Sequence, residues 1–106
     1  MKTQLKKGVL EMCVLSLIAK RDHYAYEIVQ TLEETIEISE GTIYPLMRRL
    51  QGEKYVSTYL VESGSGPSRK YYRIEDKGKI ELETMKAEWR NFYTDVNFLL
   101  GWEEEK

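Results

Sequence analysis

The side chains that could do chemistry in this 106-residue chain are basic or carry hydroxyls, and they gather in two short stretches. The first stretch, residues 39–49, ends in two adjacent arginines. An arginine can donate two parallel hydrogen bonds to guanine, and hydroxyls with free backbone N–H groups at a helix start can hold phosphate. Solvated arginines on a surface helix are the alternative. We interpret this stretch as a candidate DNA contact made by Ser39, Thr42, Tyr44, Arg48 and Arg49.

The second stretch places Arg69 and Lys70 directly after residues 63–68, which are rich in glycine and serine and contain a proline. This composition is typical of a turn, and glycines let a backbone approach a ligand closely. Contact with phosphates or the minor groove is the functional interpretation, and an exposed hairpin with a basic end is the alternative. Tyr71 and Tyr72 must face opposite sides of a strand, and the sequence does not decide which one is exposed.

Other chemistries find little support. Cys13 is the one cysteine and His23 the one histidine, so no disulfide, thiolate cluster or histidine-rich metal site is expected. We expect an inert, buried thiol at Cys13 and a capping or surface role for His23. No nucleophile–base pair or phosphate loop is present, so we expect no enzyme, cofactor or metal. No apolar run reaches the roughly 18 residues of a membrane helix, and a cytoplasmic protein is expected.

Charge is unevenly distributed along the chain. The net charge is −2, yet residues 39–73 carry six cations and three anions, a net charge of +3. Residues 24–38 carry four glutamates and no cation. An acidic protein can bind a polyanion if its cations share one face.

The hydrophobic pattern predicts the elements that hold these residues. Helical spacing predicts helices over about residues 5–20 and 24–35. A third helix should start near Thr42 after a tight turn over residues 39–41, because Pro45 is tolerated in a first turn and not in a helix interior. Strands are expected over residues 55–61 and 69–74. A fourth helix should run from Asp76 to about Leu100, followed by a frayed tail over residues 103–106.

The fourth helix carries one narrow apolar stripe whose members are three and four residues apart. That spacing is typical of a helix that packs against another along a seam, so we predict a homodimer. The predicted interface residues are Leu82, Met85, Trp89, Phe92, Val96 and Leu99.

Three helices followed by a hairpin is the element order of a winged-helix domain. Residues 24–28 (YAYEI), 40–50 (EGTIYPLMRRL) and 67–74 (PSRKYYRI) resemble, in order and spacing, the PadR family of transcriptional regulators. Ala25 and Glu75 depart mildly from the family pattern. The fold expected is mainly α with a small β-hairpin, a winged helix-turn-helix plus a long C-terminal dimerisation helix. Residues 1–75 would form the DNA-binding region and residues 76–106 the dimerisation helix, within one compact domain.

The resemblance implies a homodimeric repressor on double-stranded DNA with a pseudo-palindromic operator. In the small subclass of the family, a tryptophan at the place of Trp89 lines a pore in the dimer interface that holds flat aromatic drugs. A planar hydrophobic or aromatic effector is therefore expected near Trp89, Phe92, Tyr93, Val96 and Leu15, and plain packing of Trp89 is the alternative. Two rival functions remain open: a winged-helix protein-interaction module, and a DNA-binding regulator without a small-molecule effector.

Overall fold

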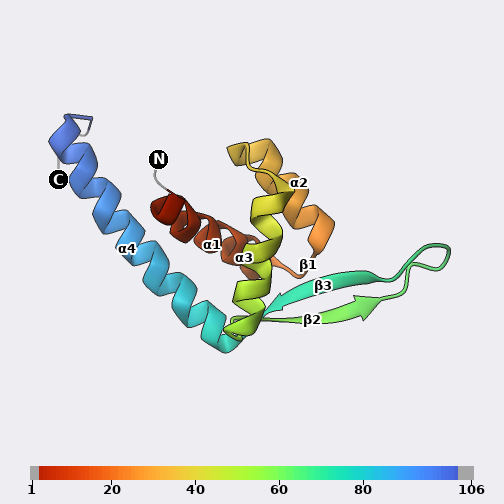
Figure 1. The fold of residues 1–106 in the computed structure, drawn as a ribbon. Helices are drawn as coiled ribbons and strands as arrows, with labels where there is room; N and C mark the ends of the chain where they lie inside the picture. The colour runs from red at the N-terminus through yellow and green to blue at the C-terminus, as the bar shows by residue number, and fades with distance from the viewer. Residues whose placement is uncertain (1–2, 103–106) are drawn as a thin grey trace.

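The computed structural model describes residues 3–102, with side chains from Gly8 onward. This part of the chain folds into four helices and a three-stranded antiparallel sheet. The elements are, in order, α1 (Thr3–Lys20), β1 (His23–Tyr24), α2 (Ala25–Ile36), α3 (Glu40–Gly52), β2 (Val56–Val61), β3 (Arg69–Ile74) and α4 (Asp76–Leu100). Helices α1, α2 and α3 are grouped beside the sheet, and α4 runs away from it (Figure 1). The tail predicted over residues 103–106 lies outside the described residues.

The core forms where the apolar faces of α1, α2 and α3 meet. These faces follow the spacing expected of amphipathic helices, so the predicted helices are confirmed. Each large apolar side chain that leaves water contributes about 1.5–3 kcal/mol to folding. The buried residues include Leu10, Val14, Leu15 and Ile18 of α1, Ile28, Val29 and Leu32 of α2, and Ile43, Leu46, Met47 and Leu50 of α3.

Helix α3 begins at Glu40, two residues before the predicted start, and holds Pro45 in its interior. The proline has no N–H to donate, and its helical acceptor would be the carbonyl of Gly41. The first turn is tight, since the Ser39 carbonyl accepts hydrogen bonds from the backbone N of both Thr42 (3.0 Å) and Ile43 (3.2 Å). This placement adds Glu40 and Gly41 to the helix and leaves Ser39 as its N-cap residue.

The sheet contains one strand more than the predicted hairpin. β1 pairs with β3, placing His23 opposite Tyr72 and Tyr24 opposite Tyr71, so the strand order is β1-β3-β2. His23 is buried, so the surface role offered for it was wrong. Its Nδ1 lies 2.8 Å from the Arg21 carbonyl oxygen, directly after the end of α1, which agrees with the capping role. A two-residue strand is too short to show a period of two, which is why the sequence did not reveal it.

Helix α4 starts against the connection between α3 and β2, packs on α1 and then projects away from the sheet (Figure 1). The Tyr55 carbonyl accepts a hydrogen bond from the Glu75 backbone N at 2.9 Å, and Lys77 Nζ donates to the Glu53 carbonyl at 2.9 Å. Gly78 lies so close that a Cβ there would be 2.1 Å from the Tyr55 oxygen. Glycine at this position therefore permits the close approach that sets the direction of α4.

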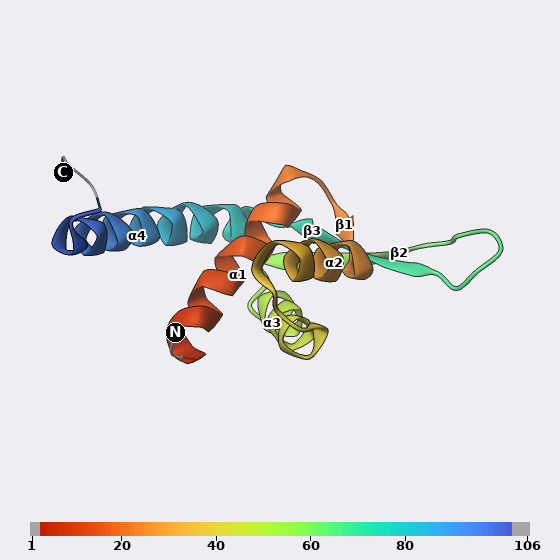
Figure 2. The same ribbon diagram turned by 90° about the horizontal axis from the view of Figure 1, so that it is seen from above.

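The molecule is elongated, because α4 and the β2–β3 hairpin project in opposite directions (Figure 2). Its extents are 55 × 28 × 21 Å and its radius of gyration is 15.8 Å. A compact chain of this length would have a radius of gyration of about 13 Å. None of the helices that the structure describes is both long and apolar enough to cross a membrane.

Candidate nucleic-acid interface and adjoining cavities

The outward face of α3 carries most of the first predicted basic stretch. Ile43 and Leu50 point into the core, which turns Ser39 and Arg48 to solvent and leaves Tyr44 half-buried. Arg48 makes no hydrogen bond or ion pair with any residue the structure describes. A free guanidinium on an exposed helix face can reach a DNA base or a phosphate.

Tyr72 on β3 is close enough to α3 to be affected by the charge of Arg48. Burial raises the pKa of the Tyr72 phenol, and the nearby charge of Arg48 partly offsets this rise. Tyr72 is 4% exposed, so it is the core member of the tyrosine pair and Tyr71 faces outward, half-buried. Arg48 is thus an exposed cation whose charge acts on the Tyr72 phenol.

Arg49 has protein partners that Arg48 lacks. Its Nε donates a 2.8 Å hydrogen bond to Oε1 of Glu11 on α1, and its Nη1 lies 3.8 Å from Oε1 of Glu53. The Glu11 side chain is only 10% exposed, whereas that of Arg49 is 55% exposed. The sequence did not reveal this pair, because Glu11 and Arg49 are 38 residues apart and belong to different helices.

The hairpin presents its two predicted cations on opposite faces of β3. Arg69 lies over the ring of Tyr24, with 4.8 Å between its Cζ and the ring centroid, and Lys70 Nζ lies 5.5 Å from the ring of Tyr72. Both side chains are exposed and, among residues 3–102, neither has a carboxylate partner. They are available to phosphates at the edge of the molecule.

A row of tyrosines crosses the outer face of the sheet. Tyr71 on β3 lies between Tyr24 on β1 and Tyr59 on β2, with ring centroids 5.6 Å apart on each side. Asp22 accepts a 2.5 Å hydrogen bond from the Tyr59 hydroxyl, which raises the pKa of that phenol, and also lies 3.6 Å from Arg73. These contacts hold the base of the hairpin against the turn between α1 and α2. Sequence reasoning missed them because β1 was not recognised.

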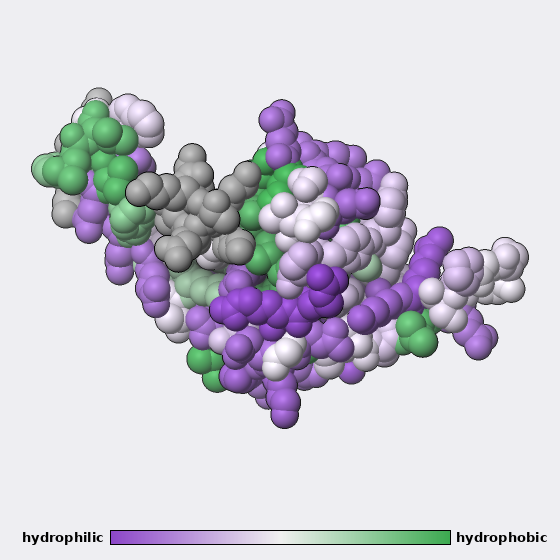
Figure 3. Space-filling view, viewed as in Figure 1, coloured by the Kyte–Doolittle hydropathy of each residue, from purple (hydrophilic) through white to green (hydrophobic). Residues whose placement is uncertain are grey.

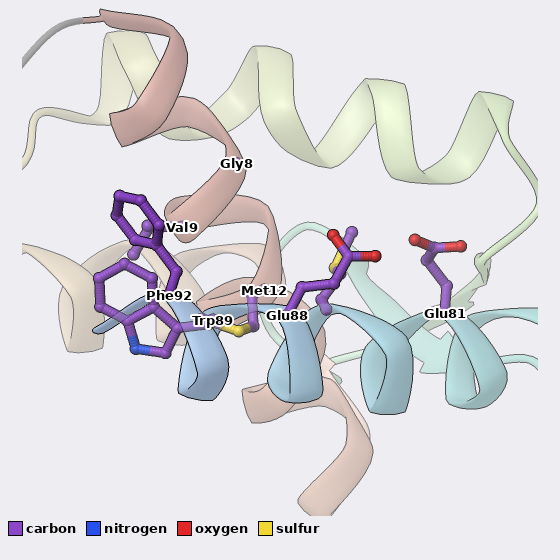
Figure 4. A pocket seen from close by; sticks show the side chains of 8 residues that line it. Gly8, Val9, Met12, Glu81, Glu88, Trp89 and Phe92 are labelled. Atoms are coloured by element: carbon purple, nitrogen blue, oxygen red, sulfur yellow. The ribbon is translucent and has the colours of Figure 1, made fainter. Parts of the chain in front are cut away.

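A cavity of about 550 Å³ lies between α1 and α4 (Figure 4). Apolar side chains line most of it, and two carboxylates on α4 stand along it. A planar apolar molecule with a positive charge would suit such a lining. The lining residues are Gly8, Val9 and Met12 from α1, and Glu81, Met85, Glu88, Trp89 and Phe92 from α4.

A second cavity of about 230 Å³ lies on the opposite flank of Trp89. It is lined by basic and aromatic side chains of α4, including Lys86, Arg90 and Tyr93, and by Cys13 of α1. Trp89 thus separates an acidic side from a basic side. Burial raises the pKa of the Cys13 thiol, which keeps it protonated near neutral pH.

The predicted effector and interface residues divide into two groups. Leu15 is fully buried in the core and Leu82 is 5% exposed, so neither is available to an effector or a second chain, and both assignments are corrected. The start of the apolar stripe on α4 is not available as a dimer interface, because the first turns of α4 already pack on α1. Further along, Phe92 and Leu99 are 51% and 82% exposed. Val96 is half-buried and lines neither cavity.

Within the described residues, no three His, Cys, Asp or Glu side chains gather closely enough to hold a metal ion.

Comparison with known proteins agrees with this geometry. A family model described as the transcriptional regulator PadR-like family matches residues 14–84. The chain is similar to a PadR-like transcriptional regulator from Bacillus cereus of known structure, with 42% identity and a TM-score of 0.82 over 98% of this chain and 100% of that one. A Streptococcus transcriptional regulator of known structure has 36% identity and a TM-score of 0.83, over 92% of this chain and 98% of its own. An uncharacterized protein from Lysinibacillus sphaericus is 33% identical over 92 residues, which are 83% of this chain and 84% of that protein.

Proposed function

The chain belongs to the PadR-like family of transcriptional regulators. From this premise we propose that it is a homodimeric transcriptional repressor that binds double-stranded DNA. The observation that carries the proposal is the free guanidinium of Arg48 on the outward face of α3, with the exposed pair Arg69 and Lys70 on the hairpin. Helix α3 enters the major groove and the hairpin contacts the adjacent backbone. Ser39, Thr42 and Tyr44 add phosphate contacts at the start of α3.

Dimerisation is supported by the far half of α4. Apolar side chains gather at the free end of this helix (Figure 3), where Phe98, Leu99, Leu100 and Trp102 are at least half exposed. A second copy of the chain that packed on this end of α4 would remove these side chains from water. A two-fold dimer reads a pseudo-palindromic operator, with half-sites roughly one helical turn, or about 34 Å, apart.

The effector is proposed to be a planar, hydrophobic or aromatic molecule held at the dimer interface beside Trp89 and Phe92. The cavity volume of about 550 Å³ falls within the range of ordinary ligand sites. Glu81 and Glu88 favour a positive charge on the ligand, while Tyr93 and Val96 of α4 extend the aromatic and apolar surface. If the ligand binds best when α3 is misplaced for DNA, it weakens operator binding by the same factor.

The proposal is tested by exposing sheared genomic DNA to the purified protein and sequencing the bound fragments. We expect enrichment of a motif with two-fold pseudo-symmetry. Recovery without any sequence preference would contradict a role as an operator-binding repressor and would favour the protein-interaction module.

A further inference from the structure

Glu11 is a buried carboxylate within the apolar segment of α1, residues 8–19. The residue is 8% exposed and its neighbours Leu10 and Val14 belong to the core. Burying a charge costs several kcal/mol unless a partner compensates for it. Among the described residues, the compensating group is the guanidinium of Arg49, whose Nε lies 2.8 Å from Glu11 Oε1.

The two adjacent arginines of α3 leave the helix in different directions. Successive residues on an α-helix are about 100° apart, because 3.6 residues make one turn. Arg48 is exposed and has no carboxylate partner among the described residues, whereas Arg49 points to α1 and lies between Glu11 and Glu53. A DNA phosphate would have to compete with two carboxylates for Arg49 and with none for Arg48.

The turn of α1 that carries Glu11 also lines the larger cavity. Val9 and Met12 face that cavity, and Glu11 lies between them in the sequence and faces α3. Glu11 and Arg49 also line a groove of about 430 Å³ that runs along α3 past Thr42 and Pro45. The ion pair therefore joins the last turn of α3 to the helix that forms one wall of the cavity.

We propose that Glu11 and Arg49 form a clamp that sets the position of α3 relative to α1, so that Arg49 is a positioning residue for DNA binding and not a DNA contact. This inference rests on the proposed function, because it requires that α3 reads the operator. It changes the role expected for Arg49 from its sequence position beside Arg48. It also makes α1 the element through which the cavity is connected to α3.

The test compares the wild type with Glu11→Gln, Arg49→Gln and the double variant on one enriched DNA site at several salt concentrations. The clamp predicts that each single change lowers operator affinity by roughly 3- to 30-fold and that the double variant is no weaker than the worse single variant. The affinity loss expected for Glu11→Gln is the most specific result, because removing a negative charge would by itself strengthen binding to a polyanion such as DNA. Neither change alters the slope of log affinity against log salt, whereas the control Arg69→Ala lowers it by about 1.

Circular dichroism and urea titration of each variant separate folding from binding. The clamp is overturned if Glu11→Gln leaves affinity unchanged or raises it, if Arg49→Gln lowers the salt slope by about 1, or if the variants lose stability while the folded protein binds as before. If a single variant does not fold, the double variant decides, because it leaves no buried charge unpaired. Lower operator affinity with an unchanged salt slope then supports the clamp, and a slope lower by about 1 overturns it. A wild type that binds no site specifically contradicts the proposed function instead.

Discussion

Arg48, Arg69 and Lys70 are three cations that the described part of the protein leaves without a carboxylate partner. Arg21 and Arg73 are each paired with one carboxylate, and Arg49 is paired with two. A paired arginine must give up its partner before it binds a phosphate, so unpaired cations are the better DNA ligands. The distinction separates residues that the sequence presents as equivalent, since Arg48 and Arg49 differ only in the side of α3 on which they lie.

Replacing the unpaired cations should separate phosphate contacts from base contacts. We expect Arg69→Ala and Lys70→Ala each to lower the salt slope of operator binding by about 1, with a similar loss for all sequences. Arg48→Ala should cost about 1–3 kcal/mol on the operator and relax specificity. Fluorescence anisotropy at several salt concentrations measures both effects.

The matched control is Lys79→Ala, which removes an exposed lysine already paired with Asp76 at 3.8 Å. The slope of log affinity against log salt for Lys79→Ala should equal that of the wild type. Equal slopes and affinities for all four variants would support the interaction-module alternative.

Trp89 can be tested through its fluorescence. A planar cationic dye that enters the cavity beside Trp89 should quench the indole, and Trp89→Ala should abolish this quenching while the protein stays folded. Trp102→Ala should leave most of it, because Trp102 lies beyond the end of α4 and is 75% exposed. Plain packing predicts instead no quenching by any dye of a neutral and cationic panel, and a loss of about 3–5 kcal/mol of stability in Trp89→Ala.

At the scale of elements, the sequence was informative wherever one face of a helix is buried. The repeat of Ile43, Leu46, Met47 and Leu50 predicted α3, because a buried stripe must follow the 3.6-residue period. Its start was misplaced because the rule against an interior proline places Pro45 in the first turn, whereas the structure begins the helix two residues earlier, at the tight turn after Ser39. β1 could not be found, since a two-residue strand is defined by its partner β3 and not by its own pattern.

The candidate site was predictable only in part for the same reason. Basic residues on α3 and the hairpin could be found from composition and helical spacing. Long-range pairs such as Glu11 with Arg49, and Asp22 with Tyr59, arise from tertiary packing and leave no local pattern. Leu15 and Leu82 were misassigned because periodicity shows that a face is apolar and not which neighbour covers it.

The junction between β2 and α4 gives a prediction at this scale. Gly78→Ala would place a Cβ 2.1 Å from the Tyr55 oxygen, so α4 must move away from the β2 start. We expect a loss of about 1–3 kcal/mol in the free energy of unfolding, measured in urea. Gly52→Ala is the control, since a Cβ there meets nothing within 4 Å, and it should be neutral or stabilising. A Gly78→Ala protein as stable as the wild type would show that this contact does not fix α4.

At the scale of the whole molecule, the elongated shape leaves large apolar side chains exposed at the end of α4. A stable dimer interface of the obligate kind buries more than about 2,000 Å² and resembles a core cut in half. The exposed apolar side chains at the end of α4 provide surface of this kind, and they lie outside the residues matched by the family model.

The dimer is tested by placing a charge on the exposed stripe. Leu99→Asp should convert the protein from dimer to monomer at micromolar concentration in light scattering, because Leu99 is 82% exposed in one protomer and would be buried in two. The control is Ile80→Asp, which should leave the dimer intact, because Ile80 is 71% exposed near the start of α4 and lies 19 residues before Leu99. A wild type that is a well-folded monomer at this concentration would rule out the homodimer.

Hydroxyl-radical footprinting of the wild type on an enriched genomic site tests the central claim most directly, because it reports DNA binding, symmetry and contact positions together. The account predicts two protected half-sites related by two-fold symmetry and about 34 Å apart, with flanking protection from the hairpin that weakens in Arg69→Ala and Lys70→Ala. A single asymmetric block of protection, or protection that neither variant changes, would contradict a dimer that reads DNA with α3 and the hairpin.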